Sequence, residues 1–414
     1  MERKKQPMKR IYILTAAFIM ILAVSTATLL VSYTPSGSST VKDPVYVGIA
    51  FGGNTTEQAK ILIDKTKNYT NLFVLDCGIN AISLNRSAVE EICQYATDAG
   101  LKIIVNLGTY TRQNWDWQNQ LFIDIKNQYG EQFLGTYYDD EPGGVPLDWN
   151  WTREFAINPL PFGANFTEPI KSKIQTAIQT GQNPSDYSVE AQWFKEFLTE
   201  NPGHRDLISD NIATFTSDYA LYWFDYIGGY DTMFAQLGWN ESVNRQISLV
   251  RGAAQLQGKD WGTIITWKYM QPPYIDTADN VYDQMVTSFN AGAKYITIFD
   301  YPYNVTGNPY GILTDEHFQA LERFWNQVAT KATPNSAVAQ AALVLPKDYG
   351  SGLRSATDKI WGVWGPDDKS APCYNNIVKL LNEYGFQLDI VYDDPAYPLQ
   401  GNYSRVYYWN QTIT

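Results

Sequence analysis

The sequence predicts an α/β fold: a (β/α)8 barrel followed by a small C-terminal α/β domain and preceded by a transmembrane helix. Four observations lead to this prediction. Short apolar segments alternate with amphipathic helical segments from residue 45 onward. Polar residues follow most of those apolar segments, and a charge-free apolar segment lies near the N-terminus. A chain of 414 residues has room for a barrel of roughly 250 residues and a smaller domain.

The N-terminal segment predicts a membrane anchor. Residues 1–10 form a basic tail, and residues 11–33 carry no charge. As a helix, the second segment would be about 34 Å long, enough to cross a bilayer. The basic flank predicts a cytoplasmic N-terminus, with everything after a linker at 34–44 outside the cell. The alternative is a signal peptide cleaved near Ser25-Thr26-Ala27, which would make the protein secreted.

N-glycosylation sequons are consistent with an extracellular location, in a host that glycosylates. They begin at Asn54, Asn68, Asn85, Asn150, Asn165, Asn240, Asn304, Asn402 and Asn410.

Four βα units come first, which indicates a parallel sheet covered by helices. Thr55 with Gln58, and Ser87 with Glu90, have capping-box spacing and predict two helix starts. The predicted strands cover 45–50, 72–76, 101–107 and a segment that ends with Tyr137 to Glu141, and the predicted helices cover 55–69, a segment from 87 to about 100, and 118–129.

The remainder of the barrel resumes after an insertion at 143–187. Long insertions in barrels gather in the loops of the active face. We expect helices at 188–200, 211–226, 243–257, 277–291 and 315–331, and strands at 232–237, 262–267 and 295–299. This gives seven strands over residues 45–332. The eighth is expected near 311–313 or in the later region.

The last part of the chain, 338–414, is expected to form the small α/β domain. It has strand patterns at 341–345, 388–392 and 406–409, and a helix from Ser370 that ends at Gly385.

The composition excludes several function classes. A net charge of −12 argues against nucleic-acid binding, which requires Lys and Arg. Two His leave little material for a zinc site or a Ser-His-Asp triad. The chain has no Walker loop, GxSxG or GxGxxG, so we expect no cofactor. The 29 Tyr and 13 Trp favour a neutral sugar partner, whose C–H faces stack on aromatic rings.

Carboxylates are therefore the candidate catalytic groups. Asp139, Asp140 and Glu141 follow the fourth predicted strand, and close carboxylates raise one another's pKa. Strand alternation would place Tyr137, Asp139 and Glu141 on one side and Tyr138 and Asp140 on the other. Because the C-terminal ends of barrel strands form the active face, residues at those ends are candidate substrate contacts. They are Asp76, Asn106, Asp140, Gln236, Trp267, Lys268, Tyr269 and Tyr303, with Trp115 and Trp149 from neighbouring loops.

This arrangement resembles the (β/α)8 glycoside hydrolases, in which an acid/base carboxylate ends the fourth strand and a second carboxylate ends the seventh. The resemblance implies that Glu141, in Asp-Glu-Pro, is the acid/base, and that Asp300 is the second carboxylate, where those enzymes usually have Glu. Asp139 would then tune the proton affinity of Glu141. The small C-terminal layer is similar to the amidotransferase-like domain of some barrel β-galactosidases.

Two alternatives remain open. One is a catalytically silent carbohydrate-binding or cell-envelope protein, which the Asp at position 300 favours. The other is a Ca²⁺ site formed by Asp76, Asp139, Asp140 and Glu141. The glycosidase hypothesis, in contrast, involves no metal.

Overall fold

The computed structural model describes most of the chain from Pro44 onward, and Val45–Thr414 form one compact unit. For residues 112–116 and 149 only the backbone is described. The described ranges are 44–78, 80–108, 112–149, 176, 179–180, 186–301, 303, 309–331, 339–399 and 403–413.

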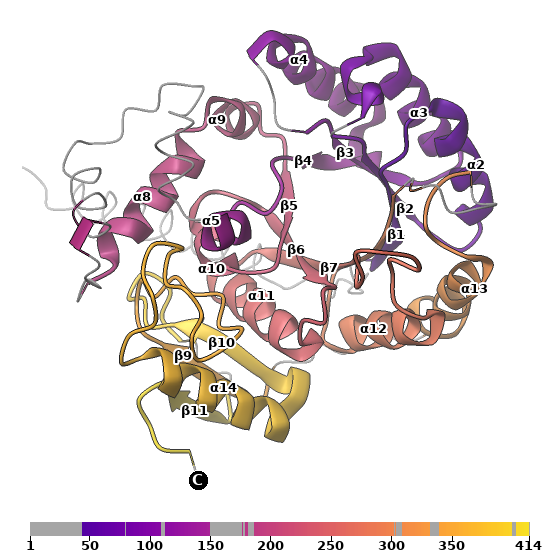
Figure 1. The fold of residues 1–414 in the computed structure, drawn as a ribbon. Helices are drawn as coiled ribbons and strands as arrows, with labels where there is room; N and C mark the ends of the chain where they lie inside the picture. Colours follow the sequence, from indigo (N-terminus) through magenta and orange to yellow (C-terminus); the bar gives the residue numbers. More distant parts are fainter. Residues whose placement is uncertain are drawn as a thin grey trace, which may run out of the picture. The chain divides into compact units, whose positions relative to one another are not determined.

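A closed barrel of eight parallel strands forms the centre of the molecule, and the strands follow one another in chain order (Figure 1). β8 pairs with β1, which closes the ring. The predicted (β/α)8 fold is therefore confirmed. The strands are β1 (Tyr46–Phe51), β2 (Leu72–Asp76), β3 (Lys102–Asn106), β4 (Phe133–Tyr137), β5 (Thr214–Asp218), β6 (Thr232–Leu237), β7 (Asp260–Ile265) and β8 (Tyr295–Asp300).

Helices surround the barrel in Figure 1. The capping box of Thr55 and Gln58 is confirmed at the start of α2, and Gly258 ends α11 in the left-handed conformation that favours glycine. The helices of this part are α2 (Thr56–Thr66), α3 (Arg86–Asp98), α4 (Arg112–Tyr129), α5 (Gly144–Trp149), α8 (Ser188–Thr199), α9 (Pro202–Ser209), α10 (Tyr222–Ile227), α11 (Val243–Gln257), α12 (Ala278–Asn290) and α13 (Asp315–Phe324).

The fifth strand corrects the prediction of one helix over 211–226. Thr214 to Asp218 form β5, and only Tyr222–Ile227 are helical, as α10. Thr214 and Thr216 are β-branched and fit a strand better than a helix. Leu221 has a φ of 55°, a left-handed conformation that separates the two elements. Because β5 completes the barrel, the predictions of an eighth strand near 311–313 or in the later region were wrong.

Two element boundaries also differ from the prediction. α3 begins at Arg86, and its N-cap is Asn85, whose side chain accepts from the Ala88 amide at 3.3 Å. The Ser87 capping box is therefore not the helix start. β4 ends at Tyr137, so Asp139 to Glu141 lie in the loop that follows the strand.

The interior of the barrel is filled by alternate strand residues, as expected for parallel strands with helices outside. Leu72, Val74, Ile104, Phe215 and Phe234 belong to this interior cluster. The intervening residues pack outward against the helices in a second, larger cluster. A side chain's position along its strand therefore decides whether it faces the interior or the helical layer.

The C-terminal part forms a parallel sheet in the order β10-β9-β11, with α14 (Ser370–Tyr384) beside it. Its strands are β9 (Ala341–Leu345), β10 (Leu388–Tyr392) and β11 (Arg405–Tyr408). The sheet packs on α11 of the barrel, where Arg251 and Asp389 form a buried ion pair of 2.7 Å. The second small sheet is confirmed.

No helix among the residues that the structure describes is long and apolar enough to cross a membrane. The predicted anchor at 11–33 lies outside those residues, and so does most of the predicted insertion at 143–187.

Candidate active site

Polar side chains face the interior at the C-terminal ends of four strands. Asp76 continues the interior face of Leu72 and Val74, and Asn106 continues that of Ile104. Ser217 and Gln236 occupy the same place on β5 and β6, following Phe215 and Phe234. This end of the barrel is the one at which barrel enzymes carry their active sites.

Glu141 reaches this group from the loop after β4. Gln236 Nε2 donates a hydrogen bond of 2.8 Å to Glu141 Oε1. Burial, followed by the charge of Asp140, raises the pKa of Glu141 to about 7, although the Gln236 hydrogen bond opposes this. A carboxyl group with this pKa can donate a proton near neutral pH.

Asp140 lies in the same network. Its Oδ1 accepts hydrogen bonds from the Tyr137 hydroxyl and from Ser217 Oγ, the second at 3.3 Å. Asp140 is exposed to solvent, yet burial among surrounding protein atoms is the main cause that raises its pKa. A carboxylate on the wall of a concave surface is expected to be open to solvent on one side and surrounded by protein atoms on the others. Asp140 therefore contributes to the interior wall together with Glu141.

Strand alternation gave the wrong faces for this loop. Tyr137 faces the interior cluster, but Tyr138 packs outward and stacks on His204. Asp139 and Glu141 both have positive φ, of 57° and 53°, so the chain after Tyr137 is not an extended strand. The main carboxylate neighbour that raises the pKa of Glu141 is Asp140 and not Asp139.

Asp139 forms local contacts. Its Oδ1 accepts the Asp140 amide at 3.0 Å, and its carbonyl accepts Thr216 Oγ1 at 2.7 Å. Burial raises its pKa to about 6. These contacts give Asp139 a part in shaping the loop, and the tuning role predicted for it fits Asp140 better.

Asp76 and Asn106 form a second polar pair. Asn106 Nδ2 donates to Asp76 Oδ1 at 2.6 Å, and Asn106 Oδ1 accepts the Gly108 amide at 2.7 Å. Burial and the charge of Asp140 raise the pKa of Asp76 to about 7. Asp76 and Asp140 are therefore close enough to interact electrostatically, so the structure brings together most of the polar residues predicted from the strand ends.

The structure does not bring Asp300 into this group. Its neighbour Phe299 packs on the interior cluster, so Asp300 points to the helical side of β8, and it is fully buried. Asp300 Oδ1 accepts the Leu313 amide at 3.1 Å, and a Cβ added at Gly311 would meet Oδ1 at 1.9 Å. Burial raises the pKa of Asp300 to about 7. This environment does not support the predicted pairing with Glu141.

Because β5 was missed in the prediction, the strand that Asp300 follows was also numbered wrongly in the comparison with the (β/α)8 glycoside hydrolases. Asp300 ends the eighth strand, whereas the resemblance places the second carboxylate at the seventh. The seventh strand, β7, is followed by Thr266, Trp267 and Lys268, none of which is acidic.

Aromatic rings gather over β7 and β8. We call this group the aromatic surface. Trp267 is at its centre, with ring centroids 5.1 Å from Tyr303 and 6.0 Å from Trp239. Tyr303 stacks on Tyr274 at 4.6 Å. Its members are Trp239, Trp267, Tyr269, Tyr274, Phe299, Tyr301 and Tyr303, of which Trp239, Tyr269 and Tyr303 are exposed.

Lys268 is engaged beside this surface. Its Nζ binds Asp276 Oδ2 at 2.7 Å and lies 5.6 Å from the centre of the Tyr269 ring. Because the Lys268 ammonium group is paired with Asp276, its charge is already balanced and is poorly suited to orient an acidic sugar. Trp115 and Trp149 belong to α4 and α5, but their side chains lie outside the description.

Asp218, at the end of β5, was missed because its strand was predicted to be a helix. Its carboxylate accepts the amides of Gly143 at 2.6 Å and Gly144 at 2.9 Å. It also accepts those of Tyr219 at 2.7 Å and Ala220 at 3.1 Å. Asp218 therefore anchors the loop immediately after Glu141.

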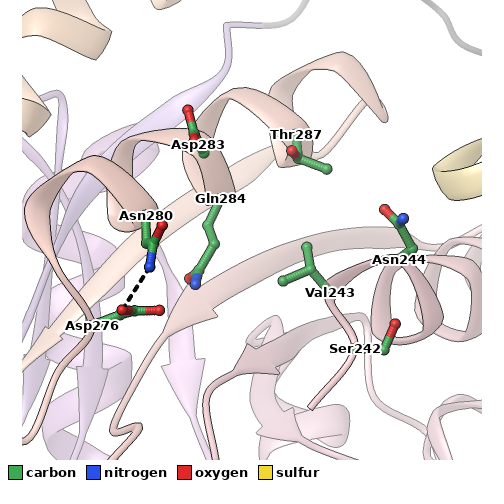
Figure 2. Close-up of a pocket in the computed structure, with 8 residues that line it drawn as sticks. All are labelled: Ser242, Val243, Asn244, Asp276, Asn280, Asp283, Gln284 and Thr287. Carbon is green, nitrogen blue, oxygen red and sulfur yellow. Dashed lines mark hydrogen bonds between the residues drawn. The ribbon is translucent and has the colours of Figure 1, made fainter. Parts of the chain in front are cut away.

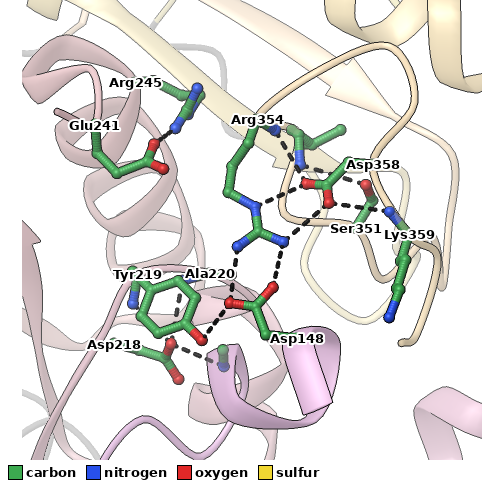
Figure 3. A network of polar contacts seen from close by, with 12 residues as sticks. Asp148, Asp218, Tyr219, Ala220, Glu241, Arg245, Ser351, Arg354, Asp358 and Lys359 are labelled. Atoms are coloured by element: carbon green, nitrogen blue, oxygen red, sulfur yellow. Dashed lines mark hydrogen bonds and ion pairs between the residues drawn. The ribbon is translucent and has the colours of Figure 1, made fainter. Parts of the chain in front are cut away.

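A second anchor comes from the loop between β9 and α14 of the C-terminal part (Figure 3). Arg354 forms a bidentate ion pair with Asp148 of α5, at 2.8 and 3.1 Å, and also binds Asp358 at 2.9 Å. Tyr219 donates its hydroxyl to Asp148 at 2.8 Å. No local sequence signal identifies a pair this far apart. The loop from Glu141 to α5 is thus held at both ends.

A separate pocket of about 260 Å³ lies between α11 and α12 (Figure 2). Asp276, Asn280 and Asp283 line it, and Asn280 binds Asp276 at 2.8 Å. It contains none of the interior carboxylates. Within the part of the chain that is described, no three His, Cys, Asp or Glu side chains converge as a metal site, so the Ca²⁺ alternative has no geometric support.

Comparison with known proteins shows the fold. No family model and no curated protein matches the chain. A GH5_18 variant from Streptomyces cattleya, in complex with Manβ1-4GlcNAc, is similar with a TM-score of 0.51 and 10% identity, over 88% of this chain and 99% of that one. A β-galactosidase from the psychrophilic Marinomonas ef1 also gives a TM-score of 0.51 and 10% identity, over 84% of this chain and 70% of that one. The chain has a glycoside-hydrolase-like barrel fold.

Proposed function

We propose that the protein is a glycoside hydrolase that acts on a neutral carbohydrate, with Glu141 as the proton donor. The observation that carries this proposal is the position of Glu141. It follows β4 of a glycoside-hydrolase-like barrel, and it is bound by Gln236 at 2.8 Å with a pKa raised to about 7. An acid with this pKa is partly protonated at neutral pH, as a general acid must be.

The aromatic surface supports a carbohydrate substrate. Exposed rings such as Tyr303 and Trp239 offer flat apolar faces, while Asp76, Asn106 and Asp140 offer hydrogen-bond partners for hydroxyl groups. The interior is lined by acids, and Lys268 is paired with Asp276. A neutral sugar fits these charges better than an anionic one.

We further propose that this domain lies outside the cytoplasm, anchored by residues 11–33. The sequence pattern of that segment supports this location. The described sequon residues also support it, because Asn54, Asn68, Asn85, Asn240 and Asn410 are all exposed.

The proposal is tested with Glu141→Gln on a broad panel of oligosaccharides and chromogenic glycosides. We expect the variant to lose about 100-fold or more of the turnover on any substrate that the parent hydrolyses, because general acid catalysis contributes about that much. Glu57→Gln, on the exposed side of α2, is the matched control and should leave turnover unchanged. Equal turnover by Glu141→Gln and the parent would refute the proposal.

The second candidate is a non-catalytic carbohydrate-binding protein on the same barrel. Two observations favour it: β7 ends without an acid, and Asp300 faces the helices. Binding of glycans without turnover across the panel, with affinity reduced by loss of Tyr303 but not by Glu141→Gln, would decide for this candidate.

A further inference from the structure

Two of the interior carboxylates, Asp140 and Glu141, lie on one wall of the barrel, and the third, Asp76, ends β2. Asp140 and Glu141 are consecutive, and Ser217 and Gln236 bridge them. Gln236 Nε2 donates to Glu141 Oε1 at 2.8 Å and to Ser217 Oγ at 2.9 Å, and Ser217 Oγ donates to Asp140 Oδ1 at 3.3 Å. In two-carboxylate glycosidases the acid and the second carboxylate flank the scissile bond from opposite sides. Consecutive residues joined by this network do not flank it.

The opposite wall of the barrel, at the ends of β7 and β8, carries aromatic side chains. In a closed ring of eight strands, β8 lies across from β4. The interior residue at the end of β8 is Phe299, while Asp300 faces the helices. β7 delivers Trp267, which packs on Phe299 at 6.3 Å. Among the described residues of these two strand ends, no carboxylate faces Glu141.

Asp140 has the properties of a group that receives a substrate N–H. The Tyr137 and Ser217 hydroxyls both donate to Asp140 Oδ1, and the Glu141 amide also donates to this carboxylate, which fixes its orientation. Neither hydroxyl bonds to Oδ2, which is the oxygen that we assign to a ligand. Asp140 is also solvent-exposed, so a bound sugar can reach it.

We propose that the nucleophile is supplied by the substrate, which is a β-linked 2-acetamido-2-deoxy sugar. This inference rests on the proposed hydrolase function. The carbonyl oxygen of the acetamido group attacks C1 and forms a cyclic oxazolinium ion. The bond from C1 to the leaving oxygen breaks, its electron pair goes to that oxygen, and the oxygen takes the proton of Glu141. Asp140 accepts the N–H of the oxazolinium and stabilises its positive charge.

The second half of the reaction restores the protein. Glu141, now ionised, removes a proton from water, and the water oxygen attacks C1. The oxazolinium ring opens, and its electrons return to the amide carbonyl. One water is consumed for each glycosidic bond, with no oxidation or reduction. Since both attacks occur on the face opposite the departing group, the leaving group must be trans to the acetamido group, and the β configuration is retained.

The test compares three chromogenic β-glucosides that differ only at C2, bearing acetamido, trifluoroacetamido or hydroxyl. We expect the acetamido compound to be hydrolysed at least about 100-fold faster than the hydroxyl compound, because only it carries an internal nucleophile. The trifluoroacetamido compound should be slower than the acetamido compound, because fluorine withdraws electrons from the carbonyl oxygen. We also expect Asp140→Asn to lower kcat on the acetamido compound more than it changes KM.

A thiazoline derived from N-acetylglucosamine, which mimics the cyclic intermediate, provides a readout on the unmodified protein. We expect it to inhibit hydrolysis competitively. Equal or faster hydrolysis of the hydroxyl compound would overturn this inference while leaving the proposed hydrolase function intact. Absence of both turnover and thiazoline binding, with all three glycosides, would overturn the inference and count against the hydrolase function as well.

Discussion

Arg354 and Asp148 are separated by 206 positions in the chain, and their side chains form a bidentate ion pair with N–O distances of 2.8 and 3.1 Å. This pair connects the loop after β9 to α5, which begins three positions after Glu141. Burial alone would raise the pKa of Asp148, but the hydrogen bonds from Arg354 and Tyr219 outweigh it. The pKa is therefore lowered, and the carboxylate is ionised. Arg354 therefore balances the charge of Asp148, which acts on Glu141.

Arg354→Met should raise the pKa of Glu141 and lower the stability of the protein by about 1–3 kcal/mol. Without Arg354, the negative charge of Asp148 is no longer balanced, and it disfavours ionisation of Glu141. The measurement is a titration of ¹³C-labelled Glu carboxyl carbons, with Glu141→Gln used for assignment. Arg251→Met is the control, because Arg251 joins the same two parts through Asp389 but does not contact the loop. It should lower Tm without moving the Glu141 titration, and equal shifts in both variants would contradict the role of Arg354.

Asp218→Asn should loosen the loop after Glu141. An amide in place of the carboxylate turns an NH₂ group toward backbone N–H donors, so at least one of the bonds to Gly143 and Gly144 is lost, at a cost of about 1–3 kcal/mol. Hydrogen exchange at the Gly143 or the Gly144 amide should accelerate, depending on which of the two loses its acceptor. Asp231→Asn is the control at the other end of β5, where Asp231 accepts the Thr214 amide at 3.0 Å. Exchange at both Gly143 and Gly144 that is no faster in Asp218→Asn than in this control would show that Asp218 does not anchor the loop.

The central fold could be predicted because most of its elements have strong local signals. Capping residues at Thr55 and Gly258, and apolar segments of strand length, marked α2, α11 and most of the strands. β5 was missed for a physical reason. Its interior residues Phe215 and Ser217 and its outward residues Thr214 and Thr216 are all buried, so the alternation of polar and apolar residues that marks a half-exposed strand is absent.

The site was predicted in part. Residues at the ends of straight strands, such as Asp76, Asn106 and Gln236, were found because a strand fixes the direction of its side chains. The faces of Asp139 and Asp140 were predicted wrongly because two left-handed residues, Asp139 and Glu141, follow the end of β4, so the alternation of a strand does not continue through them. Asp300 was assigned to the interior by strand count, which the missing β5 shifted.

Tyr303→Ala should weaken binding of a neutral oligosaccharide by about 5- to 100-fold, because loss of one aromatic stacking partner costs about 1–3 kcal/mol. Tyr303→Phe should bind almost as well as the parent, since the ring face is retained. Isothermal titration calorimetry on a glycan that binds the parent is the measurement. Tyr408→Ala removes an equally exposed ring from β11 and should have no effect. Similar losses of glycan affinity for Tyr303→Ala and Tyr408→Ala would show that the aromatic surface is not part of the binding site.

Asp76→Asn should stabilise the protein above about pH 7 and have little effect near pH 4. The pKa of Asp76 is raised from 3.8 to about 7 in the folded protein, so the folded state binds more protons between these values. Stability therefore falls as the pH rises through this range, and the penalty is fully present above pH 7. Asparagine carries no such charge. Thermal unfolding at several pH values is the measurement, with exposed Asp279→Asn as the control. A stabilisation that does not change with pH would contradict the raised pKa.

Asp300→Asn tests the pairing that the resemblance implied. If Asp300 were the nucleophile or the base, its loss would reduce turnover by about 100-fold or more. The position of its side chain, between β8 and the Leu313 amide, predicts that turnover on any responsive glycoside changes by less than about 3-fold, because a buried carboxylate facing the helices does not contact substrate. Because burial raises the pKa of Asp300 to about 7, the variant should also be more stable than the parent above that pH and not below pH 4. Turnover measured together with pH-dependent unfolding separates the two roles: loss of turnover in a variant that is fully folded would show that Asp300 acts in the active site.

Gly311→Ala is the companion variant, since its new Cβ would meet Asp300 Oδ1 at 1.9 Å. It should lower Tm, and Asp300→Ala should relieve that loss in the double variant, because the clash disappears with the carboxylate.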